Sequence, residues 1–301
     1  MEQSPRLVVD SKCSHGEGVL WCAQRQAVLW VDIHGRRLWL HRPGDGLTRH
    51  WDLPDRPGCI GLGQGNSVLL VLASALYRAE VDADAPGPLQ LRHLADIEPA
   101  LPGHRSNDGR ADRHGNFVFG TMNENPGHAP TGAMYQYSAA HGLRRLPLGG
   151  IGIPNSICFA HDGRTLYWCD TQAGSILQAG YDPDTAQVGA PSPVVAAGAA
   201  AGSPDGSCID AEGRIWNARW GGARVVRFAP GGGIEREIRL PVPQPSCCAF
   251  GGPGLDTLYV ITSPEGLDPA ALAQAPGSGG LYALELGRPL GLPESRVELP
   301  A

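Results

Sequence analysis

Residues 105 to 122 read RSNDGRADRHGNFVFGTM, and the second half of this stretch contains the pattern that decides the fold. Gly115 to Thr121 is a run of Phe, Val and Phe between turn-forming residues, which predicts a short β-strand. The first half, which begins at Arg105, is too polar and too rich in glycine for the interior of a strand or a helix. It is expected to be a loop that leads into the strand, a common position for functional residues on a rigid scaffold.

The same unit, a run of aromatic or branched residues between two turns, occurs six times along the chain. The central residues of the six runs are Trp30, Leu70, Phe119, Tyr167, Trp216 and Tyr259. They are separated by 40, 49, 48, 49 and 43 residues. Repeats of roughly 40 to 50 residues that contain several strands are typical of β-propeller blades. Further strand signals follow each centre, so each blade has material for about four strands.

The predicted fold is therefore an all-β, six-bladed β-propeller with four-stranded blades, which takes up residues 1–301 as a single domain. A ring of blades leaves exposed edges unless the two ends of the chain meet, so Arg6–Asp10 and Gly280–Glu285 are expected to share the last blade. Residues 268–275 form the one segment with helical signals, an N-cap Asp followed by Pro. Two β-sandwich domains are the alternative, and the absence of a linker counts against them.

Composition and charge exclude several classes of partner. The net charge is -6 and no basic run is present, which argues against a nucleic-acid or anionic-membrane surface. The longest apolar run, Val68 to Leu76, is about half as long as a transmembrane helix requires. The eight cysteines form no C-x-x-C motif and the polar start has no signal peptide, which predicts a cytoplasmic protein with reduced thiols. Either a monomer or a small homo-oligomer is compatible with this composition.

Four polar stretches lie about 8 to 13 residues before the strand centre of their own repeat. They are Gly16-Glu17-Gly18, Arg105-Ser106-Asn107-Asp108-Gly109, Ile153-Pro154-Asn155-Ser156 and Ser203-Pro204-Asp205-Gly206. Equivalent positions in a propeller lie at the same end of the channel, so the four stretches are expected to converge. Asn-Asp-Gly and Pro-Asp-Gly are also common turn sequences, and singly each stretch can be read as a turn.

Glu17, Asn155 and Asp205 supply two carboxylates and an amide oxygen from three of these stretches. Hard divalent cations prefer such oxygen ligands, and two negative charges suit a dication. The sequence therefore predicts one divalent metal site. Ca²⁺, Mg²⁺ and Mn²⁺ fit this donor set, and Zn²⁺ and Fe²⁺ stay open because metal availability matters as much as affinity.

The ordered set of motifs resembles the SMP-30/gluconolactonase group of six-bladed propellers, which includes regucalcin and bacterial sugar lactonases. The matching segments are residues 16–18 to 30–32, 107–110 to 120–122, 154–156, 204–206 to 210–216, and 247–252. Each motif is weak by itself, whereas their order along essentially the whole chain is specific. Where the family often has Asn-Gly, this chain has Asn155-Ser156.

This resemblance implies a role for each site residue. Glu17, Asn155 and Asp205 would hold the metal, with Asp205 as the family's proposed general base. Arg105 and Asn107 would bind substrate oxygens. The loop from Met122 to His128 resembles the family's substrate lid, so Glu124 and Asn125 are expected to contact the sugar. Asn125 stands where regucalcin-like members have Glu, which leaves the substrate preference open.

Three further residues have less specific predictions. Asp108 is expected to be a structural turn residue. His15 could contact the predicted ligand Glu17 and support it without binding the metal itself. Trp220 either packs in the protein or stacks on a sugar.

The predicted function is metal-dependent hydrolysis of a sugar lactone, an aldono-1,4- or 1,5-lactone, to the aldonic acid, with the small-molecule lactone as the partner. The cation would polarise the carbonyl and activate a water. Two alternatives stay open: a regucalcin-type metal-binding regulatory protein, and a related propeller esterase or phosphotriesterase.

Overall fold

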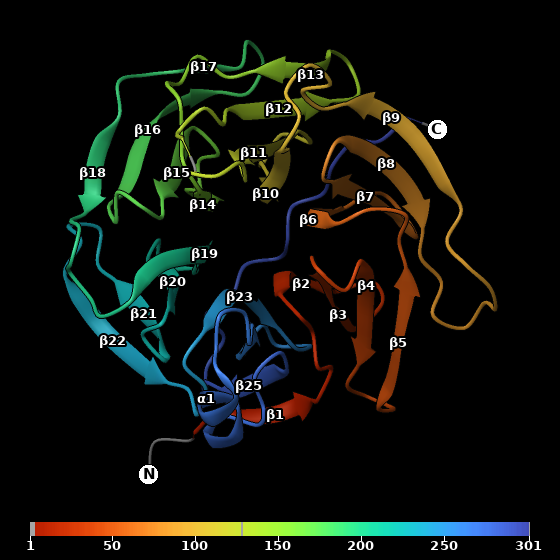
Figure 1. The fold of residues 1–301 in the computed structure, drawn as a ribbon, viewed down its shortest axis with the longest axis vertical. Helices are drawn as coiled ribbons and strands as arrows, with labels where there is room; N and C mark the ends of the chain where they lie inside the picture. The colour runs from red at the N-terminus through yellow and green to blue at the C-terminus, as the bar shows by residue number, and fades with distance from the viewer. Residues whose placement is uncertain (1–3, 128, 301) are drawn as a thin grey trace.

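Six antiparallel β-sheets surround a central channel as the blades of a propeller in the computed structural model of the chain (Figure 1). The structure describes residues 4–127 and 129–300. His128, the last residue of the predicted lid, lies outside the described residues. The predicted all-β propeller with six blades is confirmed.

The first three blades follow one another along the chain. The first contains β2 (Gly16–Cys22), β3 (Ala27–Asp32), β4 (Arg37–Arg42) and β5 (Leu47–Asp52). The second contains β6 (Pro57–Leu62), β7 (Ser67–Leu72), β8 (Ala75–Glu80) and β9 (Leu91–Asp96). The third contains β10 (His104–Ala111), β11 (Phe117–Asn123), β12 (Met134–Ser138) and β13 (Gly142–Arg145).

The last three blades complete the ring. The fourth contains β14 (Pro154–Phe159), β15 (Thr165–Asp170), β16 (Ile176–Asp182), β17 (Gln187–Val188) and β18 (Ser192–Val195). The fifth contains β19 (Ser203–Ile209), β20 (Ile215–Trp220), β21 (Arg224–Phe228) and β22 (Ile234–Arg239). The sixth contains β23 (Pro245–Gly251), β24 (Thr257–Thr262), β25 (Leu281–Glu285) and β1 (Arg6–Val9).

The fourth blade differs from the others because its outer strand is divided into two. Both β17 and β18 pair with β16, at opposite ends of that strand. Residues 189–191 separate them, and Pro191 and Pro193 lack the N–H that an unbroken ladder requires. The blade therefore has five short strands in place of four.

The ring closes as the sequence predicts, because β1 and β25 pair antiparallel in the sixth blade, with Arg6 opposite Ala283 and Leu7 opposite Tyr282. The two ends of the chain thus contribute neighbouring strands to the sixth sheet, and this pairing holds the ring closed. The predicted helix is also present as α1 (Pro269–Gln274), with the Asp268 carboxylate accepting from the N–H of Ala271. No helix in the described part of the chain is sufficiently long and apolar to cross a membrane.

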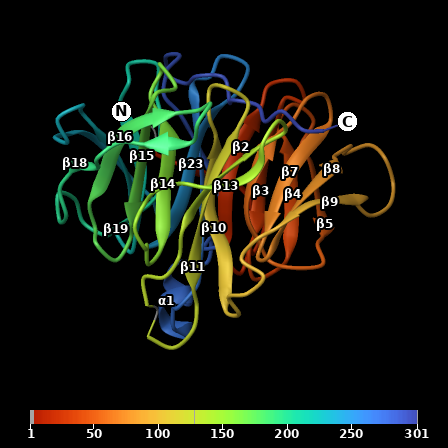
Figure 2. The ribbon, with the colours of Figure 1, turned by 90° about the horizontal axis from the view of Figure 1, so that it is seen from above.

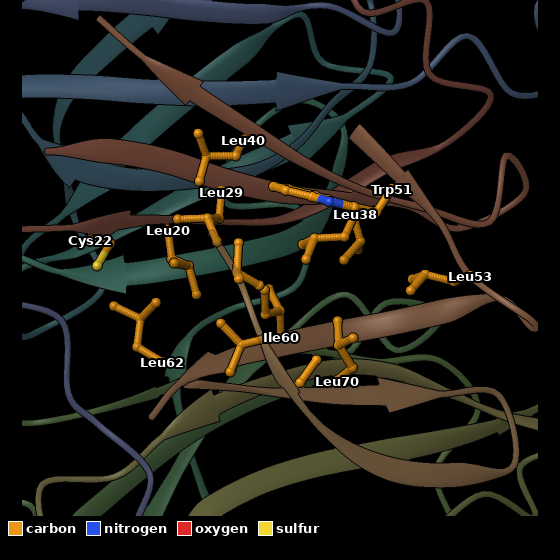
Figure 3. Packing of buried hydrophobic residues seen from close by; sticks show 14 of the residues in the cluster. Leu20, Cys22, Leu29, Leu38, Leu40, Trp51, Leu53, Ile60, Leu62 and Leu70 are labelled. Carbon is orange, nitrogen blue, oxygen red and sulfur yellow. The ribbon is translucent and has the colours of Figure 1, made fainter. Parts of the chain in front are cut away.

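The six repeat centres all lie in the second strand from the channel. These strands are packed between neighbouring blades on both faces, so β3 and β7 are buried along their whole length. Figure 3 shows one such interface, where Leu29 and Leu38 of the first blade pack against Ile60 of the second. Continuous apolar strands of this kind are the physical source of the repeat in the sequence.

One end of the channel is covered by the segment that follows β25. It crosses the turns of several blades through backbone bonds from Val297 to Leu62 and from Glu298 to Gly115 (Figures 1 and 2). Inside the channel, Glu294 of this segment forms an ion pair of 2.9 Å with the half-buried Arg110. The space left there is a cavity of only about 40 Å³, so this end does not admit a sugar.

Candidate active site

Each of the six innermost strands contains a register shift in its pairing with the second strand. The shifts follow Glu17 in β2, Pro57 in β6, Ser106 in β10, Asn155 in β14, Pro204 in β19 and Pro245 in β23. A β-bulge leaves a residue outside the ladder and changes the direction of its side chain. Asn107 and Asp205 lie within the bulges of the third and fifth blades, and Glu17 and Asn155 are the last paired residues before those of the first and fourth; all four side chains line the channel.

The expectation that the polar stretches are loops is wrong, because all four, apart from Ile153, lie in β-strands. Glu17, Asn155 and Asp205 lie within β2, β14 and β19, and both Arg105 and Asn107 lie within β10. These strands are polar and rich in glycine because they border the channel, where side chains of neighbouring blades meet at close range. The expected convergence of the stretches at one end of the channel is what the structure shows.

The polar side chains line a cavity of about 460 Å³ at the end of the channel opposite the C-terminal segment. Small-molecule sites are typically clefts of about 300 to 1,000 Å³ with a few convergent polar groups. The lining residues are His15, Glu17, Arg105, Asn107, Met122, Glu124, Ile153, Asn155, Thr171, Asp205, Trp220, Gln244, Glu265 and Gly266. They come from all blades except the second, so the site exists only in the closed ring.

The three predicted metal ligands, here called the ligand triad (Glu17, Asn155 and Asp205), are all buried in this cavity. The amide of Asn155 is oriented by two contacts. Its Nδ2 donates to Thr171 Oγ1 at 2.9 Å, and its Oδ1 accepts from Asn107 Nδ2 at 3.2 Å. The amide oxygen therefore lies on the side of Asn107 and the cavity, where it can act as a ligand.

The protein compensates the charge of the ligand triad only in part. Among the described residues, no Arg or Lys forms an ion pair with Glu17 or Asp205, and the nearest cationic partner is His15, 3.8 Å from Glu17 Oε1. Burial raises the pKa of Asp205 well above its ordinary value, and the carboxylates of Glu17 and Asp108 raise it further. Two buried carboxylates and an amide oxygen, with one imidazole and no Arg or Lys of the described residues paired with them, fit a divalent cation.

Asp108 is part of the bulge in β10 and not of a turn. Its carboxylate accepts from the N–H of Gly109 and, in the fourth blade, from that of Ile157, both at 2.8 Å. Burial, followed by the charge of Glu17, raises the pKa of Asp108 to about 6. The residue keeps the structural role expected for it, because it ties two blades together, and it adds a third acidic group beside the ligand triad.

Two aspartates, the buried Asp32 and the half-buried Asp170, fix the backbone that carries two of the predicted ligands. Asp32 accepts from the N–H groups of Ser14 and His15, both at 3.0 Å, just before Glu17. Asp170 accepts from those of Gly152 and Ile153 at 2.7 and 3.1 Å, just before Asn155. The same local arrangement thus positions a ligand in the first and fourth blades, as expected for a structural repeat.

The predicted substrate residues Arg105 and Asn107 form a connected network. Arg105 donates from Nε to Glu124 and from Nη1 to Asn107 Oδ1, both at 2.7 Å. Asn107 donates both N–H groups of its amide, to Pro154 O and to Asn155 Oδ1. In this arrangement Asn107 links Arg105 to the ligand triad, and Nη2 of Arg105 is the guanidinium nitrogen left for a ligand in the cavity.

The two lid residues behave differently. Glu124 lines the cavity, where Arg56 binds its carboxylate through two bonds of 3.0 and 2.7 Å. Partial burial raises the pKa of Glu124, but the hydrogen bonds from Arg56 and Arg105 outweigh it and hold this pKa below its ordinary value. Asn125 is not part of the cavity wall, since its amide donates to Pro102 O outside it.

Ser156 explains the difference from the Asn-Gly sequence of the resembling family. Its φ is +59°, in the left-handed region that favours glycine, and Gly18 has the same φ after Glu17. Ser156 is fully buried and donates through Oγ to Asp205 O at 2.7 Å. The hydroxyl thus offsets the backbone strain and fixes the backbone of Asp205.

Replacement of Ser156 by Ala is expected to lower the free energy of unfolding by about 1–2 kcal/mol. The change keeps the strained φ and removes the bond to Asp205 O, which leaves a buried amide of Asn217 with one partner fewer. Denaturant unfolding measures the effect. The exposed Ser192 in β18 provides the control, for which Ser192→Ala should change stability by less than about 0.5 kcal/mol. Equal stability of both variants would contradict this role.

The rim of the cavity contains Trp220 and His15, which the sequence indicated, and Glu265, which it did not. Trp220 lines the cavity and stacks on His15 with ring centroids 5.3 Å apart, so it packs against protein in this structure. Glu265 contacts His15 Nδ1 through its carboxylate. Burial alone would lower the pKa of His15, but the carboxylates of Glu17 and Glu265 raise it to about 9. Neither Glu265 nor Arg56 has a motif around it that could have predicted its place.

Comparisons with known proteins agree with this architecture. Residues 15–264 match the family described as SMP-30/Gluconolactonase/LRE-like region. The chain is 38% identical to an L-arabinolactonase of Azospirillum brasilense, over 93% of this chain and 91% of that protein. It is 32% identical to a 6-deoxy-6-sulfogluconolactonase of Pseudomonas putida, over 96% and 97% of the two chains.

A solved structure shows the same fold. The calcium-binding protein regucalcin of Agrobacterium tumefaciens superposes with a TM-score of 0.90 at 30% identity, over 98% of each chain.

Proposed function

The chain belongs to the SMP-30/gluconolactonase/LRE-like family, and from this premise we propose that it is a divalent-metal-dependent lactonase that opens a sugar lactone to the aldonic acid. The observation that carries the proposal is the buried ligand triad, with no Arg or Lys of the described residues paired to it, in the wall of a cavity that Arg105 also lines. The relatives named as sugar lactonases support the reaction class. Ca²⁺, Mg²⁺, Mn²⁺, Zn²⁺ and Fe²⁺ are the candidate cations, and the named calcium-binding relative supports a divalent ion.

A cation held by the ligand triad would polarise the lactone carbonyl and make a bound water more acidic. The side chains of the cavity supply the remaining steps. Arg105 presents Nη2 to a substrate oxygen, and Asn107 holds that guanidinium at a fixed position relative to the ligand triad. Such preorganisation lowers the barrier because the donors need no rearrangement in the transition state.

In this proposal, Asp205 accepts the proton of the attacking water. A carboxylate that binds a cation is a weaker base than a free one. The neighbouring carboxylates of Glu17 and Asp108 act in the opposite sense, because they raise its proton affinity. Both lid residues are proposed to affect sugar binding. Glu124, held by two arginines, does so by orienting Arg105. Asn125 does so from outside the cavity wall.

The experiment that tests this function is acid release from a panel of five- and six-carbon aldonolactones, with metal-free protein and with each cation added back. Turnover that needs the cation is the expected result. If no lactone of the panel is hydrolysed in a metal-dependent way, the proposal fails. Tight Ca²⁺ binding without turnover would favour the second candidate, a regucalcin-type metal-binding regulatory protein, which the regucalcin structure supports.

The setting of the reaction is part of the proposal. We infer a cytoplasmic enzyme that acts on a small molecule, as a monomer or small homo-oligomer with all residues in one domain. The net charge of -6 supports the absence of nucleic-acid and membrane partners.

Replacement of Arg56 by Gln is expected to raise KM for the lactone about tenfold, with kcat changed much less. Arg56 binds Glu124, which in turn positions Arg105, and it does not contact the ligand triad. Steady-state kinetics measure the split. Arg37, in an exposed ion pair with Asp52, is the matched control, and Arg37→Gln should leave both constants unchanged. A fall in kcat as large as the rise in KM would contradict a role in substrate binding.

A further inference from the structure

A second group of metal-binding side chains lies at the mouth of the cavity, outside the ligand triad. His15, His34 and Glu265, here called the rim triad, place one donor atom each within 4.8 Å of the others. His34 Nε2 lies 3.3 Å from Glu265 Oε1, and His15 Nδ1 contacts Glu265 Oε2. The two imidazole rings are 5.4 Å apart and nearly perpendicular, which directs different ring edges at the same carboxylate.

The backbone of the rim triad is fixed before any ion binds. The buried carboxylate of Asp32 accepts from the N–H of His15 and from that of Gly35, the residue after His34, both at 3.0 Å. The segment of Glu265 is held from the other side, because Gln244 Nε2 donates to Glu265 O at 2.8 Å. One aspartate thus positions both histidines, and only the side chains of His34 and Glu265 remain partly exposed.

The orientation of His15 also fits metal binding. Its Nε2 faces Glu17 Oε1 at 3.8 Å, while Nδ1 points to the rim, and Trp220 stacks on the ring. A metal-binding imidazole usually directs its other nitrogen at a carboxylate, which fixes its tautomer. Here that carboxylate belongs to Glu17, so the ring of His15 lies between the two groups of ligands.

We propose that the rim triad is a second metal site, which takes a borderline transition-metal ion such as Zn²⁺, whereas the all-oxygen ligand triad takes a hard dication. Two imidazoles and one carboxylate form a donor set known for zinc, with coordination positions left for water. Ligand atoms on a tetrahedral zinc lie roughly 3.4 Å apart. The side chains of His34 and Glu265 are sufficiently exposed to close that remaining distance.

The location of the rim triad predicts a structural effect. His15 and His34 belong to the first blade, whereas Glu265 follows β24 of the last blade. An ion bound by all three would join the two blades that flank the closure of the ring. Zn²⁺ is therefore expected to stabilise the protein against thermal unfolding independently of the ligand triad.

The test is Zn²⁺ titration of the metal-free full chain by calorimetry, with variants that separate the two sites. Wild type is expected to bind about two Zn²⁺ and Asp205→Asn about one, and that one should be lost or at least about tenfold weaker when His34→Asn is added. His34 does not line the cavity, so its replacement leaves the ligand triad intact. Ca²⁺ is expected to bind wild type and His34→Asn alike.

His93 provides the matched control, because it is an exposed histidine paired with Asp96 at 2.7 Å, and His93→Asn should keep both Zn²⁺ ions. Thermal unfolding of Asp205→Asn with and without Zn²⁺ gives a second readout, and the increase in Tm should disappear when His34→Asn is added. An ion pair without a metal site predicts the contrary result: His34→Asn would bind as much Zn²⁺ as wild type, and that outcome overturns the proposal.

Discussion

Replacement of Asp205 by Asn is expected to lower kcat/KM for the lactone by at least about a thousandfold. The variant keeps the shape of the side chain but loses a negative charge of the ligand triad and the group placed to accept the proton of water. Both losses act on the chemical step, so kcat should fall more than KM rises. Kinetics at saturating cation measure the effect.

Thermal unfolding of the Asp205→Asn variant checks that it is folded and tests the electrostatic argument. Wild-type Asp205 is buried near Glu17 and Asp108, so without a cation its ionised form is repelled by its neighbours. Metal-free Asp205→Asn should therefore unfold at a higher temperature than metal-free wild type, and added cation should raise its Tm less. Full lactonase activity in this variant would contradict the assigned role, and a lower Tm would contradict the electrostatic argument.

The metal-free protein is expected to lose stability as the pH rises from 5 to 8. A carboxyl group whose folded pKa is raised binds more protons in the folded state than in the unfolded one. Folding is therefore favoured at low pH, and this contribution disappears as the pH rises from the unfolded value, about 4, through the folded one. Asp108, whose pKa burial and Glu17 raise to about 6, places part of this loss between pH 4 and pH 6.

His15 acts in the same direction in the upper half of this range. Its pKa is raised to about 9 despite burial, so its stabilising contribution is complete below about 6.5 and decreases as the pH rises towards 9. Carboxylates with a lowered pKa, such as Glu124, contribute with the opposite sign. Their contribution is complete above about pH 5, so it does not reverse the trend.

Thermal unfolding of metal-free protein between pH 5 and pH 8, with and without millimolar Ca²⁺ or Mn²⁺, measures this prediction. A change of 1 kcal/mol in the free energy of unfolding shifts Tm by roughly 2–4 °C in a domain of about 150–250 residues. A decrease of several degrees is expected without cation, with a flatter profile for Asp205→Asn and for metal-loaded wild type. A Tm of the metal-free protein that increases over this range would contradict the raised pKa values of Asp108 and Asp205.

The propeller could be predicted from the sequence because its cause is local and periodic. A strand packed between two blades must be apolar along its whole length, so the centres such as Trp30 and Trp216 recur at every blade. The sequence predicts loops in place of the innermost strands because Gly-rich polar sequences normally form turns. Their strand structure depends on neighbouring blades that are distant in sequence.

The members of the cavity could be predicted only in part. Glu17 and Asn155 are the last paired residues before the register shifts of β2 and β14, and Asp205 directly follows the last such residue of β19, so the repeat brings all three to one end of the channel. Arg56 has no such pattern, since its partner Glu124 is 68 residues away in the next blade. The placement of Asn125 outside the cavity depends on its bond to Pro102 O, which the loop sequence does not specify.

The number of blades and the closure of the ring could be predicted from the sequence, because both follow from the repeated strand pattern. The donor chemistry of the ligand triad could be predicted because it follows from residue types. Only the folded structure shows that, among the described residues, His15 is the cationic partner of Glu17 and no Arg or Lys pairs with Glu17 or Asp205, and that His15 and Glu265, 250 residues apart, meet at the rim. Charge compensation and side-chain contact depend on distances between blades, and these distances exist only when the ring is closed.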